Sequence, residues 1–131
     1  MSKVIWCSVH TPTTEQLEEL QSWLDEGDEL MYLKDINPVL FDTLINSPSM
    51  PYELLGLAKT LHELAREMDA ILAQPSGSIA FQYMFGKVAM INFYVTRVLY
   101  SHSKRVSEDI PQEDGSVKKI SIFKHECFVL V

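Results

Sequence analysis

The stretch DAILAQPSGSIAFQYMFGKVAMINF, residues 69–93, decides the fold. Its first six residues form a short apolar run that predicts a buried strand. The turn residues 75–78 end this run, and residues 79–93, apolar on nearly every side, predict a buried helix. A strand, a short loop and a helix in this order form the repeating unit of a parallel sheet with helix-covered faces.

The same alternation extends along the rest of the chain. Residues 3–9 predict a buried strand, and Thr13 with Gln16 predicts a capping box that opens the next helix. Asp114-Gly115 predicts the turn of a hairpin between arms at about 103–110 and 117–129. The other predicted elements are strands at 29–34 and 94–100 and helices at 39–45 and 52–68. We therefore expect one α/β domain over residues 1–131, small and Rossmann-like, with a mostly parallel sheet and a C-terminal β-hairpin.

Composition excludes several classes of protein. The chain has 131 residues, 47% of them hydrophobic, and only two cysteines, which excludes a disulfide scaffold or a cysteine-rich zinc site. The four histidines lack metalloprotease spacing, so we expect no metal. No apolar run reaches the roughly 18 residues of a membrane span. With no cleavable signal in view, these features predict a soluble cytoplasmic domain with no membrane partner.

The net charge of −7 argues against a generic surface for long nucleic acids, and its distribution is uneven. Residues 1–86 hold four Lys/Arg and 13 Asp/Glu, a net charge of −9. Residues 87–131 hold seven Lys/Arg and five Asp/Glu, a net charge of +2. Such a chain can bind a small anion locally, although ordinary scatter of charge explains the difference equally well.

Candidate ligand residues follow from the rule that α/β sheets bind ligands outside the carboxyl ends of their strands. The first strand ends at residues 8–11, and a histidine there either transfers protons or is satisfied by nearby backbone. Residues 76–78 form either a phosphate cradle at a helix start or a simple turn with Ser78 as N-cap. Residues 101–105 combine hydroxyls, an imidazole and two cations, or are a solvated strand end. We expect His62, on the long helix, to be exposed, and His125, on a hairpin arm, either to join the site or to face solvent.

Several of these residues together resemble a known family. The opening strand ends in His10 before a helix start with Thr13, Glu15 and Gln16. The loop 74–78 follows a buried strand, and the tail contains YSHSKR at 100–105, DGSVKK at 114–119 and SIFKH at 121–125. On these residues the chain resembles the small single-domain CRISPR-associated ring nucleases of type III systems, which are related to CARF domains.

The resemblance implies a function. Such proteins bind cyclic oligoadenylate, here expected to be the tetra-adenylate, across the axis of a homodimer in a prokaryotic cytoplasm. They cut it to linear products with 2′,3′-cyclic phosphate ends, using the 2′-OH of the ligand as nucleophile and requiring no metal or cofactor. The implied catalytic residues are His10, Ser101, Lys104 and Arg105. The implied ligand-binding residues are Thr11, Gln74, Ser76, Gly77, Ser78, His102, Ser103 and His125.

Two alternatives remain at this stage. The protein is a sensor or sink that binds the ring without cutting it, which the replacement of expected basic residues by Cys127 and Val129 favours. Otherwise it is an interaction partner of a CRISPR effector, docking through the apolar helix 79–93; a large exposed apolar face on that helix would support this reading.

Overall fold

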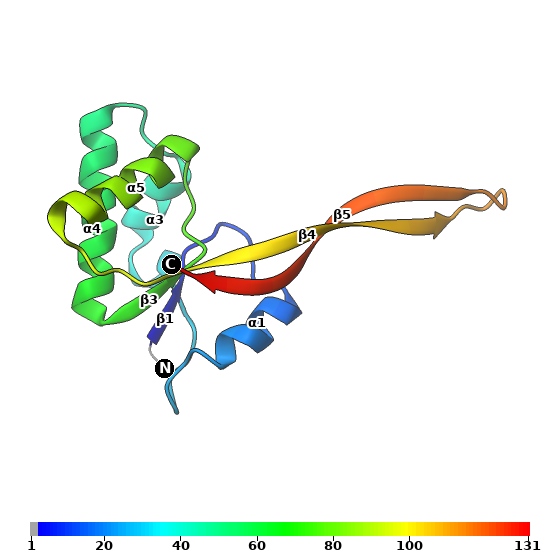
Figure 1. The fold of residues 1–131 in the computed structure, drawn as a ribbon, viewed down its shortest axis with the longest axis horizontal. Coiled ribbons are helices and arrows are strands. Elements are labelled where there is room, and N and C mark those ends of the chain that lie inside the picture. The colour runs from blue at the N-terminus through cyan, green and yellow to red at the C-terminus, as the bar shows by residue number, and fades with distance from the viewer. Residues whose placement is uncertain (1–2) are drawn as a thin grey trace.

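A computed structural model describes residues 3–131 and shows one five-stranded mixed sheet with the strand order β2-β1-β3-β4-β5 (Figure 1). β1 pairs in parallel with β2 and β3, β3 pairs in parallel with β4, and β4 pairs antiparallel with β5. The predicted α/β class, the mostly parallel sheet and the C-terminal hairpin are confirmed. The elements are β1 (Lys3–Trp6), α1 (Thr14–Gln21), β2 (Met31–Tyr32), α2 (Leu33–Ile36), α3 (Pro38–Ile45), α4 (Pro51–Met68), β3 (Ala70–Ala73), α5 (Ile79–Asn92), β4 (Val98–Pro111) and β5 (Val117–Leu130).

Alternate residues of the central strands feed two separate cores, because successive side chains of a strand point to opposite faces. Ile5 of β1 and Leu72 of β3 pack against α3, α4 and α5. Val4 and Ile71, their neighbours in sequence, pack on the other face against α1. All four side chains are at most 1% exposed. The sheet is therefore covered by helices on both faces, and Figure 1 shows α1 on the opposite side from α4 and α5.

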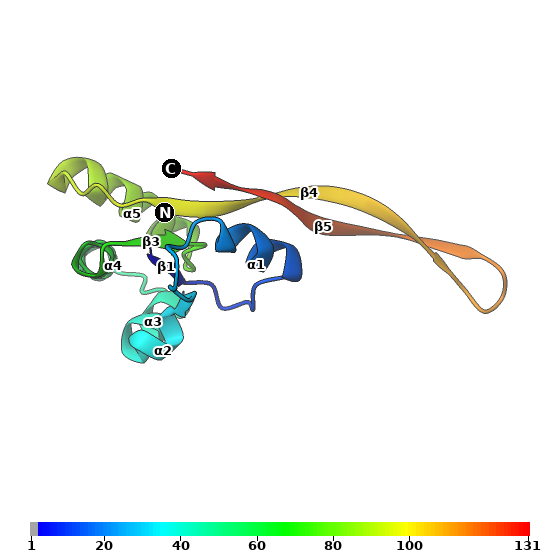
Figure 2. The same ribbon diagram turned by 90° about the horizontal axis from the view of Figure 1, so that it is seen from below.

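The C-terminal hairpin is longer than predicted. We expected separate strands at 94–100 and 103–110, but β4 is a single strand from Val98 to Pro111. Its first residues pair with β3, Val98 opposite Leu72, and the strand then continues past the end of β3. Beyond that point β4 pairs with β5 alone, and Figure 2 shows the two as a twisted arm that extends away from the helices.

The helix at 79–93 is not buried all round, which corrects the prediction. α5 buries Phe81, Phe85 and Val88. Its other apolar side chains lie at the surface, with Tyr83 72% and Met90 82% exposed. The apolar surface also includes Ile79, Ile91, Phe93 and Val95. A helix without a polar face offers no pattern from which its buried side can be chosen, so the sequence overestimates its burial.

His62 of α4 was predicted to be exposed and is 1% exposed. Its ring stacks on Phe85 at 3.8 Å and on Tyr94 at 4.8 Å between centroids. Nε2 lies 2.8 Å from the carbonyl oxygen of Phe85, so it donates, and Nδ1 accepts from the hydroxyl of Thr96 at 2.6 Å. Burial lowers the pKa of His62, partly offset by the bond to Phe85, so the neutral ring is the form that suits this core.

Candidate functional site

A cavity of about 500 Å³ opens at the carboxyl ends of β1 and β3. The predicted rim is thus a real feature, because both parallel strands end at the same edge of the sheet. The cavity brings together five predicted residues: His10 from the loop after β1, and Gln74, Ser76, Gly77 and Ser78 from the loop after β3. Its remaining lining comes from Ser8, Val9, Ile45, Asn46, Ser47 and Pro75.

Hydrogen bonds hold the loop 74–78 against its neighbours. The Ser76 hydroxyl accepts from the amide of Val9 at 3.0 Å, and the amide of Ser78 donates to the Ser47 hydroxyl at 2.8 Å. The Ser78 hydroxyl caps α5 by accepting from the amide of Phe81 at 3.1 Å, as the turn interpretation predicts. The amides of Ser76 and Gly77 form no hydrogen bond within the described residues 3–131, so they remain available to a ligand.

Gly77 is required where the loop meets α5. Its φ of +122° lies in the region that favours glycine, and a Cβ there would come within 2.7 Å of Cδ1 of Phe81. Phe81 is fully buried and cannot move aside. The loop can therefore approach the helix this closely only with glycine at this position.

Gln82 of α5, which sequence analysis missed, binds the backbone of the same loop. Its Nε2 donates to the carbonyl oxygens of Pro75 at 2.9 Å and Ser76 at 3.2 Å. Its Oε1 accepts from the hydroxyl of Tyr100 at 2.9 Å. Burial raises the pKa of Tyr100, so its hydroxyl stays protonated and able to donate. These bonds connect β4 to the rim through α5.

His10 and Thr11 are exposed at the rim. The carbonyl of His10 accepts from Nε1 of Trp6 at 2.7 Å, and its amide donates to the Ser8 hydroxyl at 3.1 Å. These bonds position the backbone, while the imidazole makes no hydrogen bond to any residue in the described part of the chain. Thr11 lines a smaller cavity of about 150 Å³ beside the first, which His10 also borders.

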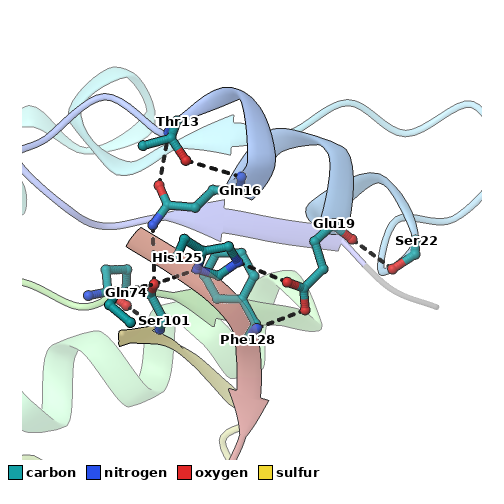
Figure 3. A network of polar contacts seen from close by, with 9 residues as sticks. Thr13, Gln16, Glu19, Ser22, Gln74, Ser101, His125 and Phe128 are labelled. Carbon is teal, nitrogen blue, oxygen red and sulfur yellow. Dashed lines mark hydrogen bonds and ion pairs between the residues drawn. The ribbon is translucent and has the colours of Figure 1, made fainter. Parts of the chain in front are cut away.

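A second polar cluster lies where β4, β5 and α1 meet, and we call Ser101, His125, Glu19 and Gln16 the relay cluster (Figure 3). The Ser101 hydroxyl is 2.6 Å from Nδ1 of His125, and Nε2 of the same ring is 2.9 Å from Oε1 of Glu19. The His125 side chain is only 5% exposed, so of the two alternatives for this residue the solvent-facing one is wrong.

The backbone orients the two outer members of the relay cluster. Oε2 of Glu19 accepts from the amide of Phe128 at 2.8 Å. Oε1 of Gln16 accepts from the amide of Thr13 at 2.9 Å, which completes the predicted capping box of α1. Because this bond uses the oxygen of the Gln16 amide, its nitrogen points to Ser101, with Nε2 3.3 Å from Oγ.

Gln74 connects the relay cluster with the rim. It lines the large cavity, and its Oε1 accepts from the amide of Ser101 at 2.7 Å. Ser103 lies next to the cluster, with its hydroxyl 3.3 Å from that of Ser101. The structure therefore groups Gln74, Ser101, Ser103 and His125, which sequence analysis chose from separate segments.

The remaining predicted residues lie farther out on the arm. His102 is 3.6 Å from Glu126, and the Arg105 guanidinium lies over the ring of Phe123 at 5.0 Å. Lys104 stands opposite Lys124 in the β4–β5 register. Alternation along β4 places Arg105 on the face that carries Ser101 and Ser103, and Lys104 on the other face. Lys104 and Arg105 therefore extend from opposite faces of β4 and do not act together on one phosphate.

Glu19 was not among the predicted site residues, and Gln16 was noted as a cap and as part of the resemblance but not as a site residue. Both lie on α1 three positions apart, a spacing that places them on one face of the helix. This shared helix face was the sequence signal that could have indicated Glu19 beside Gln16. Nothing local indicated that the face meets His125, which is 106 positions away from Glu19.

Neither a metal site nor a membrane helix is found in the part of the chain that the structure describes. No group of three or more His, Cys, Asp or Glu side chains within residues 3–131 could hold a metal ion. None of the helices described there combines the length and the apolar character needed to cross a bilayer.

Comparison with known proteins places the chain in a family. A family model with the description Uncharacterized protein MJ1673 family matches residues 2–129, nearly the whole chain. No curated protein and no solved structure matches it. Because the match covers nearly its whole length, this chain belongs to the MJ1673 family.

Proposed function

We propose that this protein is a metal-independent ring nuclease that binds cyclic oligoadenylate at the rim and cleaves it to linear products with 2′,3′-cyclic phosphate ends. The observation that carries the proposal is the cavity of about 500 Å³ at the strand ends, lined by serines and by the unpaired amides of Ser76 and Gly77. Backbone N–H groups at the start of α5 suit a phosphate there. The sequence resemblance supplies the identity of the ligand.

The chemistry needs few protein groups, because RNA carries its own nucleophile in the 2′-OH. The protein has to align that hydroxyl with the scissile phosphate and to stabilise the developing charge. In the proposal the rim loops hold the phosphates, Ser101 orients the reacting ribose, and His10 transfers protons at the cavity edge. Imidazole is the side chain most often used for proton transfer near neutral pH.

The arm supplies the cations. Lys104 and Lys124 face each other in register, and neither forms an ion pair with a carboxylate within residues 3–131. Like charges directly opposite each other destabilise a hairpin, and a bound phosphate would relieve this repulsion. Arg105 lies on the same face as Ser101 and is therefore the cation expected to approach the reacting phosphate.

We propose further that the active form is a two-fold homodimer, in which each chain gives the same loops to a symmetric ligand. The exposed apolar surface of α5 and the following loop, including Tyr83, Met90 and Phe93, supports association with another chain. The same surface supports the second candidate function, a protein that docks on a CRISPR effector. Light scattering on the isolated protein distinguishes a stable dimer from a monomer that awaits another partner.

The test of the function uses purified protein with cyclic tri-, tetra- and hexa-adenylate in EDTA, followed by chromatography of the nucleotides. Linear products are the expected result. Tight binding without products would establish the sensor instead, and absence of both would contradict the proposal.

Variants locate the activity. Arg105→Ala is expected to lower turnover about 100-fold, because it removes a charge that stabilises the transition state. Lys104→Ala, on the other face of β4, is expected to weaken ligand binding with a smaller effect on turnover. Lys118→Ala is the matched control, since Lys118 stands near the tip of the same arm opposite Ile110. Unchanged turnover in Arg105→Ala would remove this residue from the site.

A further inference from the structure

The relay cluster forms a directed chain of hydrogen bonds that ends on the Ser101 hydroxyl. A carboxylate only accepts, so Nε2 of His125, 2.9 Å from Oε1 of Glu19, carries the proton. In the neutral ring Nδ1 is then the acceptor, and it faces the Ser101 hydroxyl at 2.6 Å. Serine, imidazole and carboxylate in this order are the arrangement by which proteins activate a serine nucleophile.

Neighbouring groups hold Glu19 and His125 in the orientation that this chain of hydrogen bonds requires. The amide of Phe128 holds the second oxygen of Glu19, and the His125 side chain is 5% exposed, so the ring cannot turn freely. His125 also packs against the ring of Phe128, with 4.6 Å between centroids. Ser101 itself is only half-buried, and its neighbour Ser103 is exposed, so this end of the relay cluster lies at the surface.

An N–H donor stands next to the nucleophile. Nε2 of Gln16 is 3.3 Å from Oγ of Ser101, and the capping box fixes the orientation of its amide. When an acyl carbon bonds to Oγ, the oxyanion develops on the oxygen of that carbon, close to this donor. Donors of this kind stabilise the tetrahedral intermediates of acyl transfer.

We propose that Ser101, His125 and Glu19 form a nucleophilic serine site that hydrolyses carboxylic esters through a covalent acyl-serine. Oγ of Ser101 bonds to the carbonyl carbon while its proton passes to Nδ1 of His125. The carbon–oxygen bond to the alcohol then breaks, and the alcohol leaves with that proton. Water next attacks the acyl-serine, gives its proton to Nδ1, and releases the acid as Oγ is reprotonated. Water is the only co-reactant.

This inference goes beyond the proposed function, in which the ligand supplies the nucleophile and Ser101 only orients it. It also differs from a purely structural role, in which the relay cluster merely fastens α1 to the arm. A structural cluster leaves Ser101 unreactive, whereas an activated serine forms a covalent bond with a suitable electrophile. The two proposals can fail separately, because the covalent test requires no nucleotide.

The experiment treats the full chain with an alkyl fluorophosphonate, whose phosphorus accepts Oγ and releases fluoride. Intact-protein mass spectrometry measures the rate of adduct formation, and peptide mapping locates the adduct. We expect one adduct on Ser101, none in Ser101→Ala, and labelling about 100-fold slower in His125→Asn, since a positioned general base contributes about that much. Wild-type protein is also expected to hydrolyse p-nitrophenyl acetate faster than Ser101→Ala.

Two further variants keep the test decisive. Glu19→Gln preserves the shape of the side chain and an acceptor for the amide of Phe128, so it keeps the fold if His125→Asn does not. It is expected to slow labelling at least about tenfold, because it no longer sets the tautomer of His125. Ser107→Ala, on the same face of β4 but outside the relay cluster, is expected to label at the wild-type rate. Absence of an adduct on Ser101, or equal rates in wild type and Glu19→Gln, would overturn the proposal.

Discussion

Replacing Gly77 with alanine tests the most tightly constrained position of the rim. Two costs are expected in Gly77→Ala. A side chain at a φ of +122° is strained by about 1–3 kcal/mol. A Cβ at 2.7 Å from the fully buried ring of Phe81 overpacks the core at a further cost of about 1–3 kcal/mol. The expected loss in the free energy of unfolding is therefore about 2–6 kcal/mol.

The matched control is Gly27→Ala. Gly27 also has a positive φ, +84°, but a Cβ there meets nothing within 4 Å. This variant is expected to show only the backbone cost, about 1–2 kcal/mol. The difference between the two variants therefore contains the contact with Phe81 together with any greater backbone strain at Gly77. For a chain of 131 residues, each kcal/mol corresponds to roughly 3–4 °C in Tm, so the two variants are easily separated.

Urea unfolding followed by circular dichroism measures both variants, and the cyclic oligoadenylate assay measures their effect on the rim. Gly77→Ala is expected to weaken binding as well, because the loop must shift away from Phe81 and the Ser76 hydroxyl then loses the amide of Val9. Equal stability losses in Gly77→Ala and Gly27→Ala would refute the reasoning, since they would show that the loop moves without cost.

Three further predictions concern the core and the helices. Burial lowers the pKa of His62 in the folded state, so the unfolded chain takes up its proton first as pH falls below about 6.5, and the unfolding free energy is expected to decrease with falling pH; urea titrations at several pH values should show a shallower slope for His62→Gln. Burial also raises the pKa of the Cys7 thiol, so iodoacetamide is expected to modify only the exposed Cys127 in native protein and both thiols in urea, as mass spectrometry would show. Gly86→Ala, inside α5 with open space at its Cβ, is expected to raise the unfolding free energy by up to about 1 kcal/mol, and a lower Tm in thermal unfolding would contradict this.

Local signals predicted the parts of the fold that depend on neighbouring residues. The Thr13–Gln16 capping box forms as expected because both bonds of the box link residues three positions apart. The Asp114-Gly115 turn forms because Gly115 supplies a φ of +87° between two strands. The strand at residues 70–73 was predicted as well, since a run of four buried apolar residues bounded by turn residues suits a central parallel strand.

Features that depend on the whole fold were missed. The segment before Val98 has residues typical of strands, yet pairing with β3 starts only at Val98. His62 has the polar character of a surface residue. Inside the core its two ring nitrogens are satisfied by tertiary hydrogen bonds with Thr96 and with the Phe85 carbonyl. Propensity describes one residue at a time, whereas tertiary partners decide burial.

The candidate site was predicted in part for the same reason. The strand-end rule selected His10, Gln74 and Ser76, which the structure does bring to one cavity. Ser101 and His125 were chosen separately, and their contact became visible only when β4 and β5 paired in register. Glu19 is an ordinary helix-surface residue in the sequence, and its role depends on a strand more than a hundred residues later.

β4 is one continuous strand that belongs at its base to the central sheet and beyond Ser103 to the arm. With a rise of about 3.4 Å per residue, the arm projects roughly 30 Å from that base. A rotation of about 10° at the base would displace the tip by about 5 Å, by simple leverage on this length. Any small adjustment at Ser101 would thus be magnified at the turn around Gly115. A fluorophore attached at that turn would therefore report rim occupancy from a distance, without touching the site.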